Sequence, residues 1–361
     1  MSLDNIYFKA DAGGRLSEDE ALALAENGDI LKLAGYADKK NRAQNKNRVA
    51  YLIDRNINYT NICKSTCLFC AFYRPKGHKE AYEISYEAID KKIMDTLKKG
   101  GTRVLLQGGN HPDYTITDLE NLVGHIHNHH KIHIHAFSPP EIHHAAQVSH
   151  LSISEVINRL MDRGLASIPG GGAEILVDKI RDRISMNKCT ATQWLDVMQT
   201  AHTLGLKTTA TMMMGHVERW PDRIEHLRKL RELQDKTQGF ISFIPWTFQP
   251  ENTALHPRLK NNEDVILSTP YDYLKLISIA RLYLDNFKHI QASSLTQGIK
   301  TAQMALHYGA DDIGSVMLEE HVVSLAGCSN TGHLTPEDLA GAIKKSGCVP
   351  YQRDSFYNEI S

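Results

Sequence analysis

Three closely spaced cysteines are the residues whose types and spacing point most directly to chemistry in this chain. Cys63, Cys67 and Cys70 follow the pattern Cys-x3-Cys-x2-Cys within residues 61–73. Thiolates are the usual ligands of iron–sulfur clusters, and a four-iron cluster needs four ligands. Three cysteines therefore leave one iron open to another molecule, much as a catalytic zinc ion keeps an open position. The alternative is a zinc site, which would need a fourth ligand, and His78 is the nearest candidate downstream.

The composition narrows the class of protein around these cysteines. The chain has 361 residues, 42% of them hydrophobic and 23% charged, which is typical of a globular protein with a sizeable core. Its net charge of −1 predicts neither nucleic-acid binding nor attraction to an anionic membrane. The N-terminus lacks a signal-peptide pattern, and no apolar run reaches the roughly 18 residues of a membrane span. Because Cys189, Cys328 and Cys348 are scattered, we expect no disulfide framework and a cytoplasmic protein whose thiolates bind metal.

The elements that must position these residues are indicated by short apolar runs that alternate with longer amphipathic runs. Eight strand–helix units are expected, which predicts an α/β fold of the (β/α)8 TIM-barrel type; an open barrel of six units is the alternative. Residues 1–45 are expected to form an N-terminal helical extension, and residues 46–361 a single barrel domain with C-terminal helices. The expected strands cover residues 49–60, 102–107, 132–137, 165–169, 207–213, 240–245, 289–292 and 312–316. The expected helices cover residues 17–26, 85–99, 117–129, 152–163, 190–204, 221–237, 268–286, 296–307 and 335–346.

The C-terminal ends of the strands hold the active site in such barrels, and unusual residues gather there in this chain. The cysteine loop directly follows the first expected strand. The second strand ends in Gln107, Gly108 and Gly109, and adjacent glycines leave the backbone open to a ligand. In the third strand, alternation places His133 and His135 on one face, and we expect His135, nearer the strand end, to contact substrate.

Later strand ends add charged, histidine and aromatic side chains. After the fourth strand a triple glycine leads to Glu174, and Arg181, seven residues on, is expected on the same helical face. The pair suits a ribose hydroxyl or an ammonium group on one side and a carboxylate on the other; an ordinary surface salt bridge is the alternative. His216 follows the fifth strand, Trp246 offers an aromatic wall in the sixth, and Glu319 or the next residue reaches toward the barrel mouth.

The cysteine spacing resembles that of the radical S-adenosylmethionine (SAM) superfamily. The resemblance implies a 4Fe–4S cluster on Cys63, Cys67 and Cys70, whose open iron is chelated by the amino and carboxylate groups of SAM. It also implies residues that bind the cofactor or lie beside it, and residues that act on the substrate. The cofactor group is Tyr59, Phe69, Gln107, Gly108, Gly109, Ser138, Glu174, Arg181 and Trp246, of which Ser138 and Trp246 could also face the substrate. The catalytic group is His216, Glu319 and His135.

Residues 58–61, before the cysteines, and residues 70–74, at their end, resemble a small group of radical SAM enzymes that make aminofutalosine, cyclise dehypoxanthine futalosine or build the deazaflavin chromophore. Five further stretches extend this resemblance. They are most similar to the cyclases of that group, except that Ser294 stands where a bulky aromatic residue is expected. The matching stretches are residues 106–112, 133–142, 167–176, 211–216 and 239–246.

The resemblance to the cyclases implies a role in menaquinone biosynthesis by the futalosine route. A 5′-deoxyadenosyl radical would abstract hydrogen from the ribose C4′ of dehypoxanthine futalosine, and the ribose radical would attack the benzoate ring. The product would be cyclic dehypoxanthinyl futalosine. The implied partners are this substrate and an electron donor such as flavodoxin or ferredoxin, with a homodimer possible and neither nucleic acid nor membrane expected. The alternatives are an aminofutalosine synthase, a deazaflavin (FO) synthase subunit, or a structural-zinc barrel that binds ligands without radical chemistry.

Overall fold

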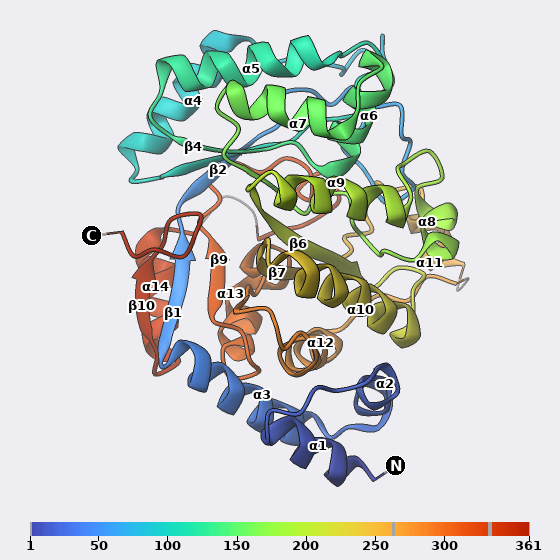
Figure 1. Cartoon of the computed structure of the whole chain (residues 1–361), viewed down its shortest axis with the longest axis vertical. Helices are drawn as coiled ribbons and strands as arrows, with labels where there is room; N and C mark the ends of the chain where they lie inside the picture. Colours follow the sequence, from blue (N-terminus) through green and yellow to red (C-terminus); the bar gives the residue numbers. More distant parts are fainter. Residues whose placement is uncertain (1, 262–263, 331–333, 361) are drawn as a thin grey trace.

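Short runs rich in Val, Ile, Leu and Met form the strands, and the strands pair in parallel. The computed structural model describes residues 2–261, 264–330 and 334–360. Within these ranges, seven strands form one curled sheet in the order β2-β3-β4-β5-β6-β7-β8, and helices cover its outer face (Figure 1). The strands are β2 (Asp54–Ile57), β3 (Arg103–Leu106), β4 (His133–Ala136), β5 (Ser167–Ile168), β6 (Lys207–Met214), β7 (Phe240–Thr247) and β8 (His289–Ile290).

A second, smaller parallel sheet closes the barrel. It has the order β10-β1-β9 and consists of β1 (Arg48–Leu52), β9 (Asp312–Ser315) and β10 (Val349–Gln352). Asp312 at the start of β9 forms a bridge with Gln291, which directly follows β8. After β9, the backbone N–H of Leu318 donates to the carbonyl oxygen of Asp54 in β2. The chain of β9 therefore lies between β8 and β2.

The predicted parallel α/β barrel is confirmed, and each of the eight predicted strand runs contains a strand within the described residues. Two details differ. The single strand expected over residues 49–60 is two strands, because the chain passes from one sheet to the other at Ile53. Sequence patterning also misses β10, because this short edge strand contains Pro350 and is only partly buried.

Helices flank the strands and precede them at the N-terminus. One of them, α5 (Ile116–His129), begins one residue before the expected helix over residues 117–129, and Thr115 and Asp118 form the capping box at its start. The helices before and around the first half of the sheet are α1 (Leu3–Asp11), α2 (Glu18–Asn27), α3 (Ile30–Asn45), α4 (Tyr86–Lys98), α5 (Ile116–His129), α6 (Pro139–Ser149) and α7 (Ile153–Asp162). The later helices are α8 (Asp178–Ile184), α9 (Ala191–Thr203), α10 (Trp220–Thr237), α11 (His256–Lys260), α12 (Pro270–Tyr283), α13 (Ser294–Ala305) and α14 (Pro336–Lys345).

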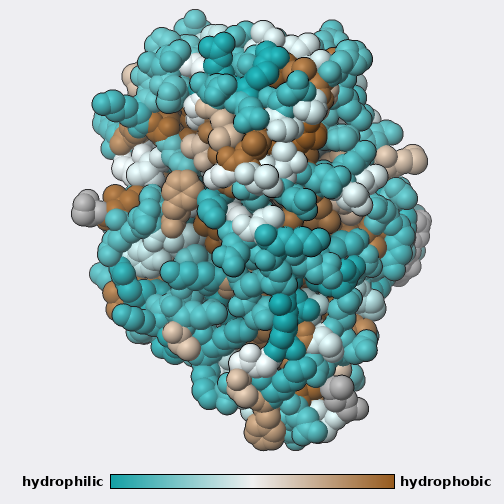
Figure 2. Space-filling model, viewed as in Figure 1, coloured by the Kyte–Doolittle hydropathy of each residue, from teal (hydrophilic) through white to brown (hydrophobic). Residues whose placement is uncertain are grey.

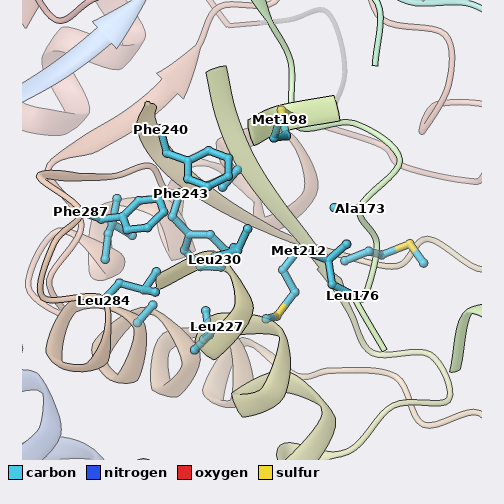
Figure 3. Packing of buried hydrophobic residues seen from close by; sticks show 14 of the residues in the cluster. Ala173, Leu176, Met198, Met212, Leu227, Leu230, Phe240, Phe243, Leu284 and Phe287 are labelled. Atoms are coloured by element: carbon cyan, nitrogen blue, oxygen red, sulfur yellow. The ribbon is translucent and has the colours of Figure 1, made fainter. Parts of the chain in front are cut away.

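The main hydrophobic core lies between the outer face of the sheet and the helices. Figure 3 shows Leu227 and Leu230 of α10 close to the aromatic side chains at β7. Phe240 stacks on Phe287 with 5.5 Å between the ring centroids. Offset aromatic pairs of this kind add to the free energy gained by burying their area. This packing fixes β6 and β7, whose inward side chains line the interior of the barrel.

The N-terminal helix α2 packs on α10 and α12, α3 packs on α12, and α1 packs on α2 and α3 (Figure 1). Arg231 of α10 donates to the carbonyl oxygen of Leu16, and Asn41 of α3 donates to that of Ala310. α3 ends at Asn45, next to the predicted boundary, and the division of the chain into an extension and a barrel domain stays a prediction. Figure 2 shows that hydrophilic residues cover most of the molecular face seen in Figure 1. None of the helices in the described ranges has the length and apolar character that crossing a membrane requires.

Buried neutral histidines predict that acid destabilises this fold. His226 is fully buried, and its Nδ1 accepts a hydrogen bond from the backbone N–H of Leu176. Burial lowers the pKa of His226 to about 3, and lowers the pKa of both His133 and His202 to about 4. Below pH ~6.5 the unfolded chain binds protons that the folded chain excludes, so stability decreases as the pH falls toward these folded values. We expect a loss of about 1.4 kcal/mol per pH unit for each such histidine.

Urea denaturation of the apoprotein between pH 7.5 and pH 5 would measure this slope. His226→Gln is expected to flatten it, because the titrating group is removed, while the exposed His307→Gln serves as the matched control. A free energy of unfolding that stays constant over this range would contradict the prediction.

Candidate active site

The cysteine loop is anchored by backbone hydrogen bonds on both of its sides. At its base, the N–H of Cys63 donates to the carbonyl oxygen of Arg74, which closes residues 63–74 into a loop after β2. At its far side, the N–H of Leu68 donates to the carbonyl oxygen of Ile184 at the end of α8. The loop therefore stands at the C-terminal end of the barrel, as the sequence predicts.

The three thiols face a common cavity from partly buried positions. Cys67 is buried, and Cys63 and Cys70 are partly exposed. The Sγ of Cys63 accepts hydrogen bonds from the backbone N–H groups of Ser65, at 3.4 Å, and Asn110, at 3.3 Å. Burial raises the pKa of the Cys67 thiol to about 12 and also raises that of Cys70. Without metal these thiols are protonated, so iron binding must release their protons.

The buried carboxylate of Glu141 joins three strand-end loops beneath the cavity. Its Oε1 accepts a hydrogen bond from the Tyr59 hydroxyl at 2.7 Å and one from the Gly108 N–H at 3.0 Å. Its Oε2 accepts from the Ser138 N–H at 2.7 Å and from the Ser138 hydroxyl. Burial raises the pKa of Glu141, and these four hydrogen bonds act in the opposite direction. Glu141 thus fixes the loops after β2, β3 and β4 relative to one another, a role that no local sequence pattern indicates.

The glycine loop after β5 presents Glu174 to the cavity. Glu174 has a φ of 39°, a strained backbone conformation for a residue with a side chain. Its Oε1 accepts from the Lys188 ammonium at 3.1 Å, while its buried Oε2 has no hydrogen-bond partner. Burial lowers the pKa of Lys188, but the charges of Glu174 and Cys67 together with the hydrogen bond to Glu174 outweigh this and leave the pKa above its ordinary value. Lys188 also lies over the Phe69 ring, 5.4 Å from its centroid.

Two adjoining cavities meet at a shared wall. The upper cavity, about 210 Å³, is lined by Cys63, Cys67, Cys70, Phe69, Gln107, Gly108, Gly109, Ser138, Glu174, Lys188 and Trp246, among other residues. The deeper cavity, about 250 Å³, runs into the barrel interior past His135. Gln107, Glu174 and Trp246 line both cavities. These three side chains can therefore contact a molecule in either cavity.

The residues present fit an iron–sulfur cluster with SAM. Three free cysteines line a cavity that also contains an unpaired, buried carboxylate oxygen on Glu174, which suits a hydroxyl or ammonium donor. In the described ranges no three Cys, His, Asp or Glu side chains converge tightly enough for a single metal ion. Zinc requires such convergence, whereas each thiolate of a cluster binds a different iron, which leaves the sulfurs further apart.

Four predicted site residues lie outside both cavities: Tyr59, Arg181, His216 and Glu319. Glu319 pairs with Arg55 and Lys92 on the outer side of β2, against α4, so its predicted position at the barrel mouth is wrong. It is Glu320 that lines the deep cavity, where backbone N–H groups of residues 322–324 satisfy its carboxylate. His216 is fully buried, with Nδ1 3.2 Å from Glu218, and reaches neither cavity.

Arg181 lies behind the glycine loop and does not line the upper cavity. Its guanidinium donates to the carbonyl oxygens of Ala173, at 2.6 Å, and Cys189, at 2.5 Å. Its guanidinium comes within 3.9 Å of the Glu174 carboxylate. The two residues do not share the predicted helical face, because Glu174 precedes α8; the path of the glycine loop brings them together instead. Arg181 is therefore placed to position the loop and Glu174.

The barrel is parallel, the loop after β2 contributes three cysteines, and a ligand-sized cavity lies beside them. This is the arrangement of a radical SAM enzyme. The family model of the radical SAM superfamily matches residues 57–230, and the family model of the CofH/MqnC C-terminal region matches residues 237–360. The solved structure of a methylornithine synthase has the same fold, with a TM-score of 0.72 at 19% identity over 96% of this chain and 97% of that one.

Full-length relatives are closer. A protein from Halalkalibacterium halodurans named cyclic dehypoxanthine futalosine synthase is 41% identical over 100% of this chain and 95% of its own length. A protein from Methanococcoides burtonii named 5-amino-6-(D-ribitylamino)uracil–L-tyrosine 4-hydroxyphenyl transferase is 40% identical over 100% of both chains. The chain belongs to the radical SAM superfamily and, within it, to the CofH/MqnC family. Membership in an enzyme family excludes the structural-zinc barrel considered from the sequence.

Proposed function

We propose that this enzyme cyclises dehypoxanthine futalosine to cyclic dehypoxanthinyl futalosine, a step in menaquinone biosynthesis. The observation that carries the proposal is the wall shared by the two cavities, formed by Gln107, Glu174 and Trp246. The likeness to the relative named cyclic dehypoxanthine futalosine synthase supports the choice of substrate. A reaction that removes a hydrogen atom from a substrate carbon depends on that carbon being held next to the cofactor, which adjoining cavities provide.

The upper cavity is proposed to hold the cofactors. Cys63, Cys67 and Cys70 would bind the cluster, and the open backbone of Gly108 and Gly109 would face SAM. Glu174 would accept a hydrogen bond from SAM through its unpaired Oε2, while Lys188 holds the other oxygen. When bound, the cluster and SAM supply the one-electron chemistry that removes a hydrogen atom from the substrate.

The deep cavity is proposed to hold the substrate. Asn56 lines it, and its buried Oδ1 has no hydrogen-bond partner, so it can accept from a sugar hydroxyl. Trp246 offers an aromatic face to the benzoate ring of the substrate. His135 is held neutral, because burial and the charges of Arg103 and Arg353 keep its pKa well below the ordinary value. The Nδ1 of His135 lies 2.6 Å from the Ser167 hydroxyl. This leaves the Nε2 of His135 as the proposed acceptor for the proton that the benzoate ring loses on cyclisation.

Anaerobic turnover distinguishes this function from its relatives. The cluster is reconstituted with iron and sulfide, and the enzyme is incubated with SAM, reductant and one substrate at a time. With dehypoxanthine futalosine we expect 5′-deoxyadenosine together with a product lighter than the substrate by two hydrogen atoms, detected by mass spectrometry.

The second candidate is hydroxyphenyl transfer, favoured by the 40% identity to the Methanococcoides burtonii relative. Incubation with 5-amino-6-ribitylaminouracil and tyrosine tests it, and an enolpyruvyl benzoate substrate tests aminofutalosine synthesis. Product formed only in one of these parallel reactions, and none from dehypoxanthine futalosine, would overturn the proposed cyclisation.

A further inference from the structure

The floor of the deep cavity is built from charged residues at the N-terminal ends of the strands. Asp54 and Arg103 are the first residues of β2 and β3, and they face each other in the strand register. Arg353 follows β10 and also lines the cavity, together with Ser355 and Tyr357 from the C-terminal segment. Barrel floors of this type are usually filled by apolar side chains, so charged groups on the floor need an explanation.

Each floor arginine is paired with a buried carboxylate, and Arg103 keeps hydrogen-bonding capacity to spare. The Nε and Nη2 of Arg103 both donate to one oxygen of Asp54. Its Nη1 has no hydrogen-bond partner among the described residues, although the side chain is only 11% exposed. Arg353 donates through Nε to Asp312 at 2.6 Å and through Nη2 to Gln291 at 3.1 Å. A guanidinium edge that lines a cavity and has no protein partner is available to a ligand there.

The electrostatic environment above this floor favours an anion. Burial is the main reason why the pKa of His135, which lines the same cavity, lies well below its ordinary value, and the charges of Arg103 and Arg353 add to this effect. A positive potential that disfavours an imidazolium would favour a carboxylate at the same place. Arginine suits this task, because its planar guanidinium matches carboxylate geometry.

The length of the cavity separates this floor from the cofactor end. Gln107 at the shared wall and Arg103 on the floor belong to the same chain segment, four residues apart. A strand advances about 3.3 Å per residue, which places the two ends about 13 Å apart. A substrate that presents a sugar carbon to the upper cavity and carries a carboxylate at its other end would span this distance.

We propose that Arg103, assisted by Arg353, forms a carboxylate-binding subsite on the barrel floor that sets the orientation of the substrate. The assignment of this carboxylate to the benzoate of dehypoxanthine futalosine rests on the proposed function. The subsite itself rests on the unpaired Nη1 of Arg103 and the two guanidinium groups facing one cavity.

Binding measurements on the reconstituted holoenzyme with SAM test the subsite. For Arg103→Gln we expect the dissociation constant of dehypoxanthine futalosine, and of benzoate as a minimal probe, to rise about tenfold or more. Arg55→Gln is the matched control, because Arg55 is on the neighbouring strand with a side chain 9% exposed but faces Thr96 and Glu319 outside the barrel. It should change either dissociation constant less than twofold.

A change to the ligand keeps the test valid if Arg103→Gln folds poorly. The substrate carboxamide should bind wild-type enzyme about tenfold more weakly than the acid. In Arg103→Gln, acid and amide should bind alike, because the group that distinguishes them is gone. Equal affinity of wild-type enzyme for acid and amide, or the same penalty for the amide in both proteins, would overturn the proposal. Benzoate binding that depends on Arg103 in an enzyme that does not cyclise dehypoxanthine futalosine would reject the proposed function while keeping the subsite.

Discussion

Cys67→Ala is expected to abolish cluster binding and SAM cleavage while leaving the fold intact. The Cys67 thiol is buried at the centre of the loop, with Cys63 and Cys70 on either side of it in the upper cavity. Two remaining thiolates cannot hold a four-iron cluster that also needs an open iron for SAM. We expect the brown absorbance to be lost after reconstitution and 5′-deoxyadenosine formation to fall on the order of 10³-fold or more. The stability of the apoprotein should change by about 1 kcal/mol, since free cysteine behaves as a small apolar residue.

Cys348→Ala is the matched control for this prediction. Cys348 is also buried, but it lies between α14 and β10, where its thiol contacts the carbonyl oxygen of Ser346. It should retain full iron content and full SAM cleavage. Retention of both the absorbance and SAM cleavage by Cys67→Ala would show that the cluster is bound elsewhere.

Local sequence patterns predict the upper cavity well, because each of its main features lies within one short segment. The cysteine spacing and the glycines at Gly108 and Gly109 each sit directly after a strand, and parallel strands bring their C-terminal ends together. Placing these segments at the correct strand ends was therefore enough to gather them around one cavity.

The predictions that failed required the register of the chain or the path of a loop. Glu319 and Glu320 are adjacent, and a shift of one residue decides which faces inward. The chain after β9 bends at Met317, whose φ is 47°, and this bend turns Glu319 outward. His216 follows Gly215, whose backbone N–H donates to Glu218, and the resulting tight turn folds the imidazole under the loop. Composition and periodicity contain no signal for either turn.

Lys188, Glu141 and Asn56 were not predicted, because their roles depend on contacts between distant segments. Lys188 comes from the loop between α8 and α9 and reaches Glu174 fourteen residues earlier in the chain. Glu141 has the pattern of a helix-capping residue, and its side chain does close a capping box with Ser138. Its bonds to Tyr59 and Gly108 add a second task, which only the assembled barrel shows.

Gly109→Ala is expected to displace the cysteine loop and to weaken cluster binding without removing a ligand. A Cβ on Gly109 would lie 2.1 Å from the carbonyl oxygen of Ile62 and 2.7 Å from the Cβ of Cys63. The first contact is with backbone, which cannot rotate away, so the loops after β2 and β3 must separate. Overpacking of this kind costs about 1–3 kcal/mol of stability. Because Cys63 moves with the loop, we expect iron affinity to fall about 10- to 100-fold, as when residues that support a metal ligand are changed.

Iron content, the visible spectrum and urea denaturation of the apoprotein measure these two effects separately. Gly341→Ala in α14 is the matched control, because no atom lies within 4 Å of the added Cβ. Alanine has the higher helix propensity, so this substitution should stabilise the protein by about 0.5–1 kcal/mol and leave iron content unchanged. A Gly109→Ala protein with full iron content and normal SAM cleavage would mean that the cluster loop does not depend on close contact with the loop after β3. Loss of iron from Gly109→Ala would show that close backbone contact between the loops after β2 and β3 holds the cluster ligands in place. This contact requires glycine at position 109, because any side chain there would push the two loops apart.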